Sequence, residues 1–320
     1  MVYETRWGEG NLPMVHMGLL AASPERVLAL RMALAPVIGP DTAVLDAGCG
    51  SLGVLSIIAA KLGARRVVAV DIGDLDAARA LARENGVADR ITWIRRDLAE
   101  LDDSVGAFDV IVAMVYNNHP VRDLPQQRLV ASLAERFARP GAALIPDTVR
   151  YSVAGYCSTA ADTGPETRRG EWTETLERIE GYTGISLRTM RDVADPLSPR
   201  KARDLRPWLG PGALSARFGY VDRRGVTQLT EHAPFTEIDY HDPATARAYP
   251  ESTTLRVIQP GRLDATIWRQ DLCYGDLLIR STETVHPVQR AHDVRPGDSA
   301  VLSTGSPWKK AIPLTIRPAG

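Results

Sequence analysis

Cysteine and net charge are both scarce in this chain, and each scarcity excludes a kind of site or partner. Only three of the 320 residues are cysteines, and Cys49, Cys157 and Cys273 lie too far apart to form a C-x-x-C metal or redox pair. The formal net charge of −1 gives no electrostatic footprint for nucleic acid or an anionic membrane. No apolar run approaches the ~18 residues of a membrane-spanning helix. We therefore expect neither nucleic acid nor membrane as a partner.

Other absences narrow the cellular context. The histidines of the second half show no metal-ligand spacing, so no metal site is predicted. The first residues carry no signal-peptide pattern, and we expect a cytoplasmic protein with reduced thiols. Arginine far outnumbers lysine, which is typical of a high-GC bacterial source. With 44 % hydrophobic residues, the chain can form one large domain or two ordinary ones.

The most informative segment runs from Val44 to Gly53. A short apolar strand leads into a glycine-rich turn, and a helix rich in Ile, Leu and Ala follows. Gly48 and Gly50 lack a Cβ where the backbone must bend sharply and a ligand must come close. The next helix directs its free N–H groups and positive dipole end at the same place. The segment predicts a site for an adenosine-bearing cofactor, with Gly48 and Gly50 among its contacts.

Asp46 indicates which adenosine cofactor binds. The spacing of the glycines also fits the G-x-G-x-x-G fingerprint of dinucleotide sites, but that fingerprint alone is weak evidence. A carboxylate two residues before the first glycine would repel a pyrophosphate. It suits a ligand with an amine and a sulfonium cation. A nicotinamide dinucleotide is therefore the less favoured alternative.

Strands and helices alternate from residue 42 to about 150. This pattern is typical of an α/β Rossmann-like, doubly wound parallel sheet. After residue 150, short β-like runs separated by Gly, Pro and Asp predict a β-rich, barrel-like second domain at 151–320, with a helical arm at about 159–210. The predicted strands are 42–46, 66–71, 91–95, 108–114 and 142–145, and the predicted helices are 53–62, 74–85 and 124–138, after a first helix from Pro24 with Val27, Leu28, Leu30, Met32 and Leu34 on one face.

The pattern D-x-G-C-G at Asp46–Gly50 resembles motif I of class I methyltransferases that use S-adenosylmethionine (SAM). The resemblance implies SAM as the cofactor, bound by residues 1–150. It also implies that the acid ending the second strand, Asp71, accepts hydrogen bonds from the ribose hydroxyls, with Ile72 beside it. Asp97 and Leu98, after the third strand, would hold the adenine.

Several segments resemble one branch of that class, the protein arginine methyltransferases. Arg26 occupies the position, in the helix before motif I, where the family's arginine binds the SAM carboxylate. Residues 145–151 are similar to the strand that leads into the family's barrel, and residues 184–197 to its arm. Residues 302–309 resemble a late loop that would place Trp308 beside the substrate pocket. The resemblance implies a homodimer.

The chain departs from this family at the acceptor site. The family grips a guanidinium with two glutamates nine residues apart, and here Met114 and Asp123 hold those positions. Ser306 and Pro307 replace the threonine and histidine of the late loop. A guanidinium needs paired carboxylates to orient it and offset its charge, and Met114 cannot supply one. We expect Met114 to line the cofactor pocket.

Polar residues take the place of the clamp after the fourth predicted strand, where open α/β sheets bind ligands. Tyr116 offers a phenol to catalysis, and Asn117 and Asn118 offer amides to a substrate. His119 is the first candidate for a general base, with Asp123 as an orienting group or alternative base. The same run also fits a plain turn with a solvated histidine.

These observations favour a SAM-dependent methyltransferase that modifies N or O of a small molecule, a secondary metabolite or a free amino acid. One alternative keeps the family's chemistry, with free or peptidyl arginine as the acceptor. Another is a sensor or partner subunit that binds SAM without catalysis. The residues that would hold the cofactor are all present, which favours catalysis.

Overall fold

The computed structural model describes residues 24–116, 123–158, 177, 226–248, 250–304 and 312–319. The chain forms two compact units. The first comprises Met1–Ser152, Pro234–Pro250 and Arg269–Thr282, and the second Val153–Ala233, Glu251–Trp268 and Glu283–Gly320. The chain returns to the first unit twice after residue 152, so the units do not follow the single boundary at residue 150 that we expected from the sequence.

A five-stranded parallel sheet forms the centre of the first unit. Its strands run in the order β3-β2-β1-β4-β5, and each neighbouring pair is parallel. All of β1, the four central residues of β2 and all but one residue of β4 are buried, as expected for apolar strands covered on both faces. The strands are β1 (Ala43–Ala47), β2 (Arg66–Asp71), β3 (Ile91–Arg95), β4 (Phe108–Ala113) and β5 (Ala138–Ile145).

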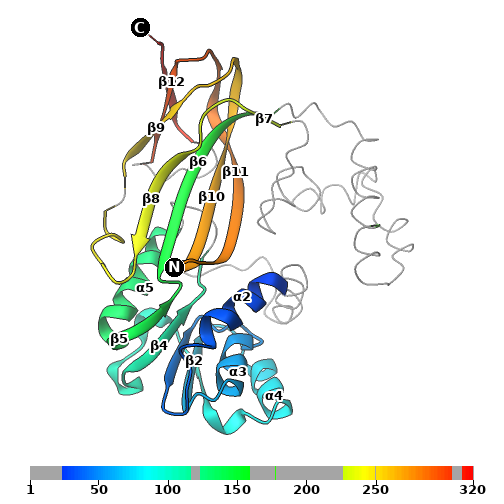
Figure 1. Cartoon of the computed structure of the whole chain (residues 1–320), viewed down its shortest axis with the longest axis vertical. Helices are drawn as coiled ribbons and strands as arrows, with labels where there is room; N and C mark the ends of the chain where they lie inside the picture. The colour runs from blue at the N-terminus through cyan, green and yellow to red at the C-terminus, as the bar shows by residue number, and fades with distance from the viewer. Residues whose placement is uncertain are drawn as a thin grey trace. The chain divides into compact units, whose positions relative to one another are not determined.

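Helices cover both faces of this sheet. The strand order reverses between β1 and β4, so right-handed crossovers place α3 (Val54–Lys61) and α4 (Asp76–Glu84) on one face and α5 (Leu124–Phe137) on the other. The contacts agree, because α3 lies against β1, β2 and β3 and α5 lies against β4 and β5. Figure 1 shows α2 (Pro24–Leu34), α3 and α4 grouped beside β2, apart from α5. Short 3-10 turns η2 (Ala88–Arg90), η3 (Leu98–Glu100) and η4 (Asp103–Val105) complete the unit.

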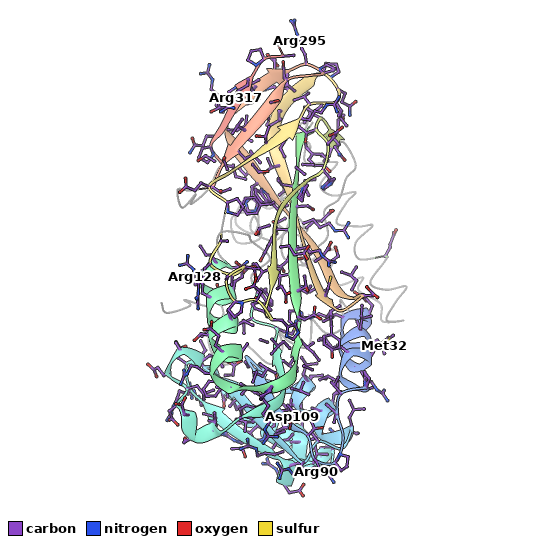
Figure 2. All side chains as sticks on the ribbon, turned by 60° about the vertical axis from the view of Figure 1, so that its left-hand side comes forward. Met32, Arg90, Asp109, Arg128, Arg295 and Arg317 are labelled. Carbon is purple, nitrogen blue, oxygen red and sulfur yellow. The ribbon has the colours of Figure 1, made fainter. Side chains whose placement is uncertain are left out.

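Helix α2 corrects one expectation from the sequence. Its buried side chains are Leu30, Ala33 and Leu34, and the helix packs on α3. Leu28 and Met32, which we expected on that same face, are 60 % and 64 % exposed. Figure 2 shows Met32 on the outer side of the helix. The apolar residues of α2 therefore lie on more than one face, since their spacing is wider than a single helical stripe.

Strand β5 begins four residues earlier than predicted. Helix α5 ends at Phe137, and the strand starts at Ala138. We expected Arg139, Pro140 and Gly141 to form a break before the strand, and they lie within it instead. Phe108 on β4 pairs with Ala138, after which a register shift leads to the pair Val110–Ala143. The bulge accommodates the turn-forming residues without ending the pairing.

Strands dominate the rest of the described chain. One sheet has the order β11-β10-β6-β7 with β8 paired to β6, and a three-stranded sheet has the order β13-β12-β9. Pairing is antiparallel between β6 and β7 and on both sides of β12. The expected fold class, a Rossmann-like sheet followed by a β-rich domain, is confirmed. The strands are β6 (Thr148–Ser158), β7 (Val226–Gln228), β8 (Ala233–Asp239), β9 (Ser252–Arg256), β10 (Gly261–Tyr274), β11 (Leu277–Val294), β12 (Ser299–Ser303) and β13 (Leu314–Arg317).

Strands β10 and β11 are much longer than the short runs expected after residue 150. They are joined by a tight turn in which Gly275 has φ +53°. Their length depends on pairing with neighbouring strands, which period-2 patterning within a short window does not report. The helical arm expected at about 159–210 lies outside the described residues, apart from Glu177. In the described part of the chain, no helix is long and apolar enough to cross a membrane.

Candidate cofactor and acceptor site

The carboxyl ends of β1, β2 and β4 lie side by side at one edge of the parallel sheet. Ala47 at the end of β1 is in register with Val70 on β2 and Ala113 on β4. The chain therefore leaves these strands at the same level, with Asp46 and Asp71 at their ends. This edge includes the point where the strand order reverses, which is where open α/β sheets bind ligands.

The glycine turn after β1 is fixed to β2 by backbone hydrogen bonds. The N–H groups of Gly48 and Cys49 both donate to the Val70 carbonyl, at 2.8 and 3.1 Å. Gly48 has φ +80°, and a Cβ there would overlap the Val115 side chain. Only glycine tolerates both this backbone conformation and this close approach, which explains why the turn has glycine at position 48.

Asp46 is a buried carboxyl group beneath the turn. It is 2 % exposed, and its Oδ2 accepts a hydrogen bond of 2.5 Å from the Ser56 hydroxyl. Burial raises the pKa of Asp46 to about 6, the bond from Ser56 opposes the rise, and the negative charge of Asp71 adds to it. A cation bound beside Asp46 would favour the ionised form, so Asp46 suits the positive end of a ligand.

Asp71 links two turns through its carboxylate. Its Oδ2 accepts the Gly50 N–H at 2.8 Å, and its Oδ1 accepts the Gly73 N–H at 2.8 Å. Gly50 has φ +70°, which directs this N–H toward the end of β2. Each carboxylate oxygen has a second lone pair, so both can still accept a hydroxyl hydrogen from a ligand. The predicted role in ribose binding is compatible with these bonds and stays a prediction.

The residues predicted to hold the adenine differ in exposure. Asp97 precedes η3, and its carboxylate accepts the Ala99 N–H at 2.9 Å, which caps this short turn. Leu98 is buried, whereas Ile72 is 53 % exposed. Asp97 thus has a local structural role, and its contact with the adenine stays a prediction.

Two half-buried arginines in the first unit, Arg26 and Arg280, influence each other. Burial lowers the pKa of the Arg26 guanidinium on α2. Burial also lowers the pKa of Arg280 on β11 to about 9, the positive charge of Arg26 lowers it further, and the negative charge of Asp123 raises it. Two like charges that act on one another away from water are both stabilised by a nearby anion. A cofactor carboxylate fits that requirement.

The segment after β4 begins with Met114, which is half-buried, and continues to the buried Tyr116. The Tyr116 hydroxyl lies 2.7 Å from the Tyr240 hydroxyl. Burial is the main reason why the pKa of Tyr116 lies well above its ordinary value, and the pKa of Tyr240 is raised for the same reason. The Tyr116 phenol therefore keeps its proton at neutral pH. It suits hydrogen bonding and does not suit the role of a base.

Asp123 lies at the centre of a buried polar cluster. It is 0 % exposed, and its Oδ2 accepts hydrogen bonds from the Tyr151 hydroxyl at 3.1 Å and from Gln270 Nε2 at 2.8 Å. The Tyr151 hydroxyl in turn accepts from Gln127 Nε2 at 2.9 Å and from Gln270 Nε2 at 2.7 Å. The structure thus joins residues of α5, β6 and β10 around a single carboxylate.

Four of the predicted site residues, Asn117, Asn118, His119 and Trp308, lie outside the described residues. Among the described residues, no group of three His, Cys, Asp or Glu side chains could hold a metal ion. Burial raises the pKa of Cys49, so its thiol in the glycine turn stays protonated.

Sequence reasoning did not identify five residues of this region: Gln127, Tyr151, Tyr240, Gln270 and Arg280. Gln270 lies 147 residues from Asp123, and Tyr240 lies 124 residues from Tyr116. Tyr151 lies in the segment 145–151 that resembles the family, but no site role was assigned to it, and the other four belong to no short motif. A long β-strand with glutamine and arginine among its apolar residues was the only available signal, and it does not say which partner those side chains meet.

Comparisons with known proteins agree with this geometry. Residues 27–135 match the family model of ribosomal protein L11 methyltransferase (PrmA). The chain is 34 % identical to the ribosomal protein arginine N-methyltransferase rmt3 of Schizosaccharomyces pombe over 117 residues. The matched segment covers 36 % of this chain and 21 % of that protein. It is 37 % identical to the ribosomal protein L11 methyltransferase of Geobacter metallireducens over 140 residues. That segment covers 42 % of this chain and 43 % of that protein. The chain spans less than half the length of these relatives.

One solved structure resembles a larger part of the chain. It is titled Trypanosoma brucei PRMT1 enzyme-prozyme heterotetrameric complex with AdoHcy, and it covers 90 % of this chain and 87 % of that one. The TM-score is 0.58 at 19 % identity, so this likeness concerns the fold. The sequence matches and the fold confirm the recognition made from the motifs. The first unit thus contains a class I methyltransferase domain, a class whose cofactor is SAM, and the chain as a whole resembles the protein arginine methyltransferases.

Proposed function

We propose that the chain transfers a methyl group from SAM to a side-chain nitrogen of arginine in a protein. Two relatives support this acceptor, since both are named for methylation of ribosomal proteins and one for arginine N-methylation. The small-molecule acceptor favoured by the sequence has no support in these comparisons, and the arginine alternative fits them better. We also propose the homodimer that the resemblance implies.

One structural observation carries the proposal. Gly48 of the glycine turn lies so close to Val115 that a Cβ would overlap its side chain. Val115 lies between Met114, which holds one position of the family's acceptor clamp, and Tyr116. The cofactor turn is therefore close to the start of the segment in which we place the acceptor residues, and methyl transfer between two bound molecules requires such proximity.

The residues of the cofactor side fit SAM in charge and hydrogen bonding. Arg26 would bind the carboxylate, and the buried Asp46 would face the cationic end of the cofactor. The Asp71 oxygens retain lone pairs for the ribose hydroxyls. Met114, Ile72, Asp97 and Leu98 complete the proposed set, with Gly48 and Gly50 providing room for the close approach.

When bound, SAM would supply an electrophilic methyl carbon, whose bond to sulfur breaks as the C–N bond forms and leaves S-adenosylhomocysteine, and the acceptor nitrogen would lose a proton. The protein has to orient the nitrogen and accept that proton. Asp123 is the carboxylate available in the described part of the acceptor region, and Tyr151 and Gln270 hold its orientation. Tyr116 keeps its own proton and would serve as a hydrogen-bond donor. His119 is a further candidate for the base.

A transfer assay with tritiated SAM tests the proposal. The acceptors would be an arginine-containing peptide and a matched peptide with lysine at each arginine position. Label in the first peptide only is the expected result. Titration calorimetry with SAM and S-adenosylhomocysteine, with NAD as the control, measures cofactor binding independently. Binding without transfer to any peptide would favour the non-catalytic sensor or partner subunit, and light scattering would report the dimer.

A further inference from the structure

Two buried amide oxygens beside Asp123 have no hydrogen-bond donor among the described residues. They are Oε1 of Gln127 on α5 and Oε1 of Gln270 on β10, and these residues are 0 % and 1 % exposed. Both glutamines belong to the first unit, together with Asp123 and Tyr151. Leaving a buried acceptor unsatisfied costs about 1–3 kcal/mol. Two such oxygens on amides that belong to the hydrogen-bonded cluster of Asp123 and Tyr151 indicate a ligand that donates hydrogen bonds.

The orientation of both amides follows from the hydrogen-bond inventory. An ionised carboxylate accepts hydrogen bonds and cannot donate them. The Tyr151 hydroxyl therefore donates its one hydrogen to Asp123. The Tyr151 oxygen must then accept from the NH₂ groups of Gln127 and Gln270, as observed at 2.9 and 2.7 Å. A flip of either amide would place an oxygen against an oxygen with no hydrogen between them. The two Oε1 atoms are therefore held away from Tyr151 as acceptors.

Arg280 influences which hydrogen-bond acceptors a cationic ligand needs near Asp123. Its positive charge and the negative charge of Asp123 attract each other within the first unit. One resident cation thus already offsets the one carboxylate. A second cation is attracted less strongly by Asp123 alone. It therefore needs further hydrogen-bond acceptors that are correctly placed. Neutral amide oxygens provide such acceptors.

We propose that Gln127 and Gln270 form, with Asp123, the subsite that binds the guanidinium of the acceptor arginine. This inference rests on the proposed function and explains how the chain does without the carboxylate that Met114 replaces. A guanidinium has five N–H donors in a planar fork and no acceptor, so it can meet a carboxylate and two amide oxygens together. The ammonium of lysine has three donors that are not planar, and it fits this set of acceptors less well.

The test uses the full chain saturated with S-adenosylhomocysteine and the probe N-acetylarginine amide, titrated by calorimetry. Gln127→Met and Gln270→Met keep the length of the side chain and remove the whole amide, that is, the free acceptor oxygen together with the NH₂ group that donates to Tyr151. Each should weaken probe binding by about 10- to 100-fold, the range for a hydrogen bond to a charged group, and leave the affinity for S-adenosylhomocysteine unchanged. N-acetyllysine amide should bind more weakly than the arginine probe to the unsubstituted chain.

Thr282→Val is the matched control. The Thr282 hydroxyl is also buried, and among the described residues it has no hydrogen-bond partner and shares no bond with the Asp123 cluster. This variant should bind the arginine probe as the unsubstituted chain does. The comparison of the arginine and lysine probes on the unsubstituted chain keeps the test decisive if a glutamine variant fails to fold.

Three results would overturn the subsite. They are unchanged probe affinity in both glutamine variants, equal affinity for the lysine probe, or no binding of the arginine probe at all. Methyl transfer to the arginine peptide together with unchanged affinity in the variants would overturn the subsite and leave the proposed function intact. Probe binding that depends on the glutamines, without any methyl transfer, would overturn the proposed function and leave the subsite intact.

Discussion

The Asp71 carboxylate at the end of β2 accepts a hydrogen bond from the Gly50 N–H at 2.8 Å, across 21 residues of sequence. The bond joins the glycine turn to the residue that we expect to contact the ribose. A substitution at Asp71 should therefore change the cofactor site in two ways, because it removes a ligand contact and releases the turn.

Asp71→Ala should weaken SAM binding by about 10- to 100-fold, because a charged acceptor of hydrogen bonds is lost. Asp71→Asn keeps one acceptor oxygen, and its SAM affinity should lie between those of the unsubstituted chain and Asp71→Ala. Asp89→Ala, which removes an exposed acid from η2, is the control and should bind SAM normally. Calorimetry measures all four chains, and normal binding by Asp71→Ala would place the ribose elsewhere.

Gly48→Ala should destabilise the chain by more than its backbone strain alone. The new Cβ meets the Val115 side chain in addition to a φ of +80°. Gly141→Ala is a matched control, since Gly141 has φ +78° and nothing lies within 4 Å of its Cβ position. We expect the free energy of unfolding to fall by about 1–3 kcal/mol more in Gly48→Ala than in Gly141→Ala.

The double variant Gly48→Ala with Val115→Ala should recover part of that difference, because it removes the overlap and leaves the strain. Urea denaturation provides the measurement. Equal losses in the two single variants would mean that Val115 moves aside without cost.

Asp46 should make the stability of the unliganded chain depend on pH. Its pKa is about 6 in the folded chain and 3.8 as the ordinary value, so the folded state binds the proton more tightly. The contribution is fully present below about pH 4 and is lost as the pH rises to about 6, by about 3 kcal/mol in total. Asp46→Asn should lack this loss, and its free energy of unfolding should exceed that of the unsubstituted chain above pH 6.

The same carboxyl group should couple the pH to cofactor affinity. SAM brings a positive charge that favours ionised Asp46, so its affinity should rise between pH 5 and 7 in the unsubstituted chain. The affinity of Asp46→Asn should be lower and change less over this range. Calorimetry across the range decides, and a flat profile in the unsubstituted chain would separate Asp46 from the cation.

Tyr116 and Tyr240 should show strong energetic coupling. Either substitution by Phe leaves the partner's buried hydroxyl without its hydrogen bond at 2.7 Å, which should cost about 1–3 kcal/mol of stability. The double variant should cost less than the sum of the two, which a double-mutant cycle of unfolding free energies measures. If Tyr116→Phe abolished methyl transfer without any loss of stability, the phenol would have a direct catalytic role.

Much of the α/β half could be predicted because its signals are local. Alternation of strands and helices, the glycines of the turn and the acid before them lie within a few residues of one another. They specify the parallel sheet and the cofactor edge. The predicted boundary after α5 was wrong, because a bulge in the pairing of β4 with β5 keeps Arg139, Pro140 and Gly141 within the strand.

The sequence by itself determined the class of the domain, its cofactor and the loss of one carboxylate at Met114. Only the tertiary structure decided what surrounds the other carboxylate. Gln127 lies one turn of α5 away from Asp123, but Tyr151 and Gln270 come from β6 and β10, and Gln270 is 147 residues distant. The physical reason is that a buried hydrogen bond requires proximity in space, and strand pairing over long separations leaves no periodic trace in the sequence.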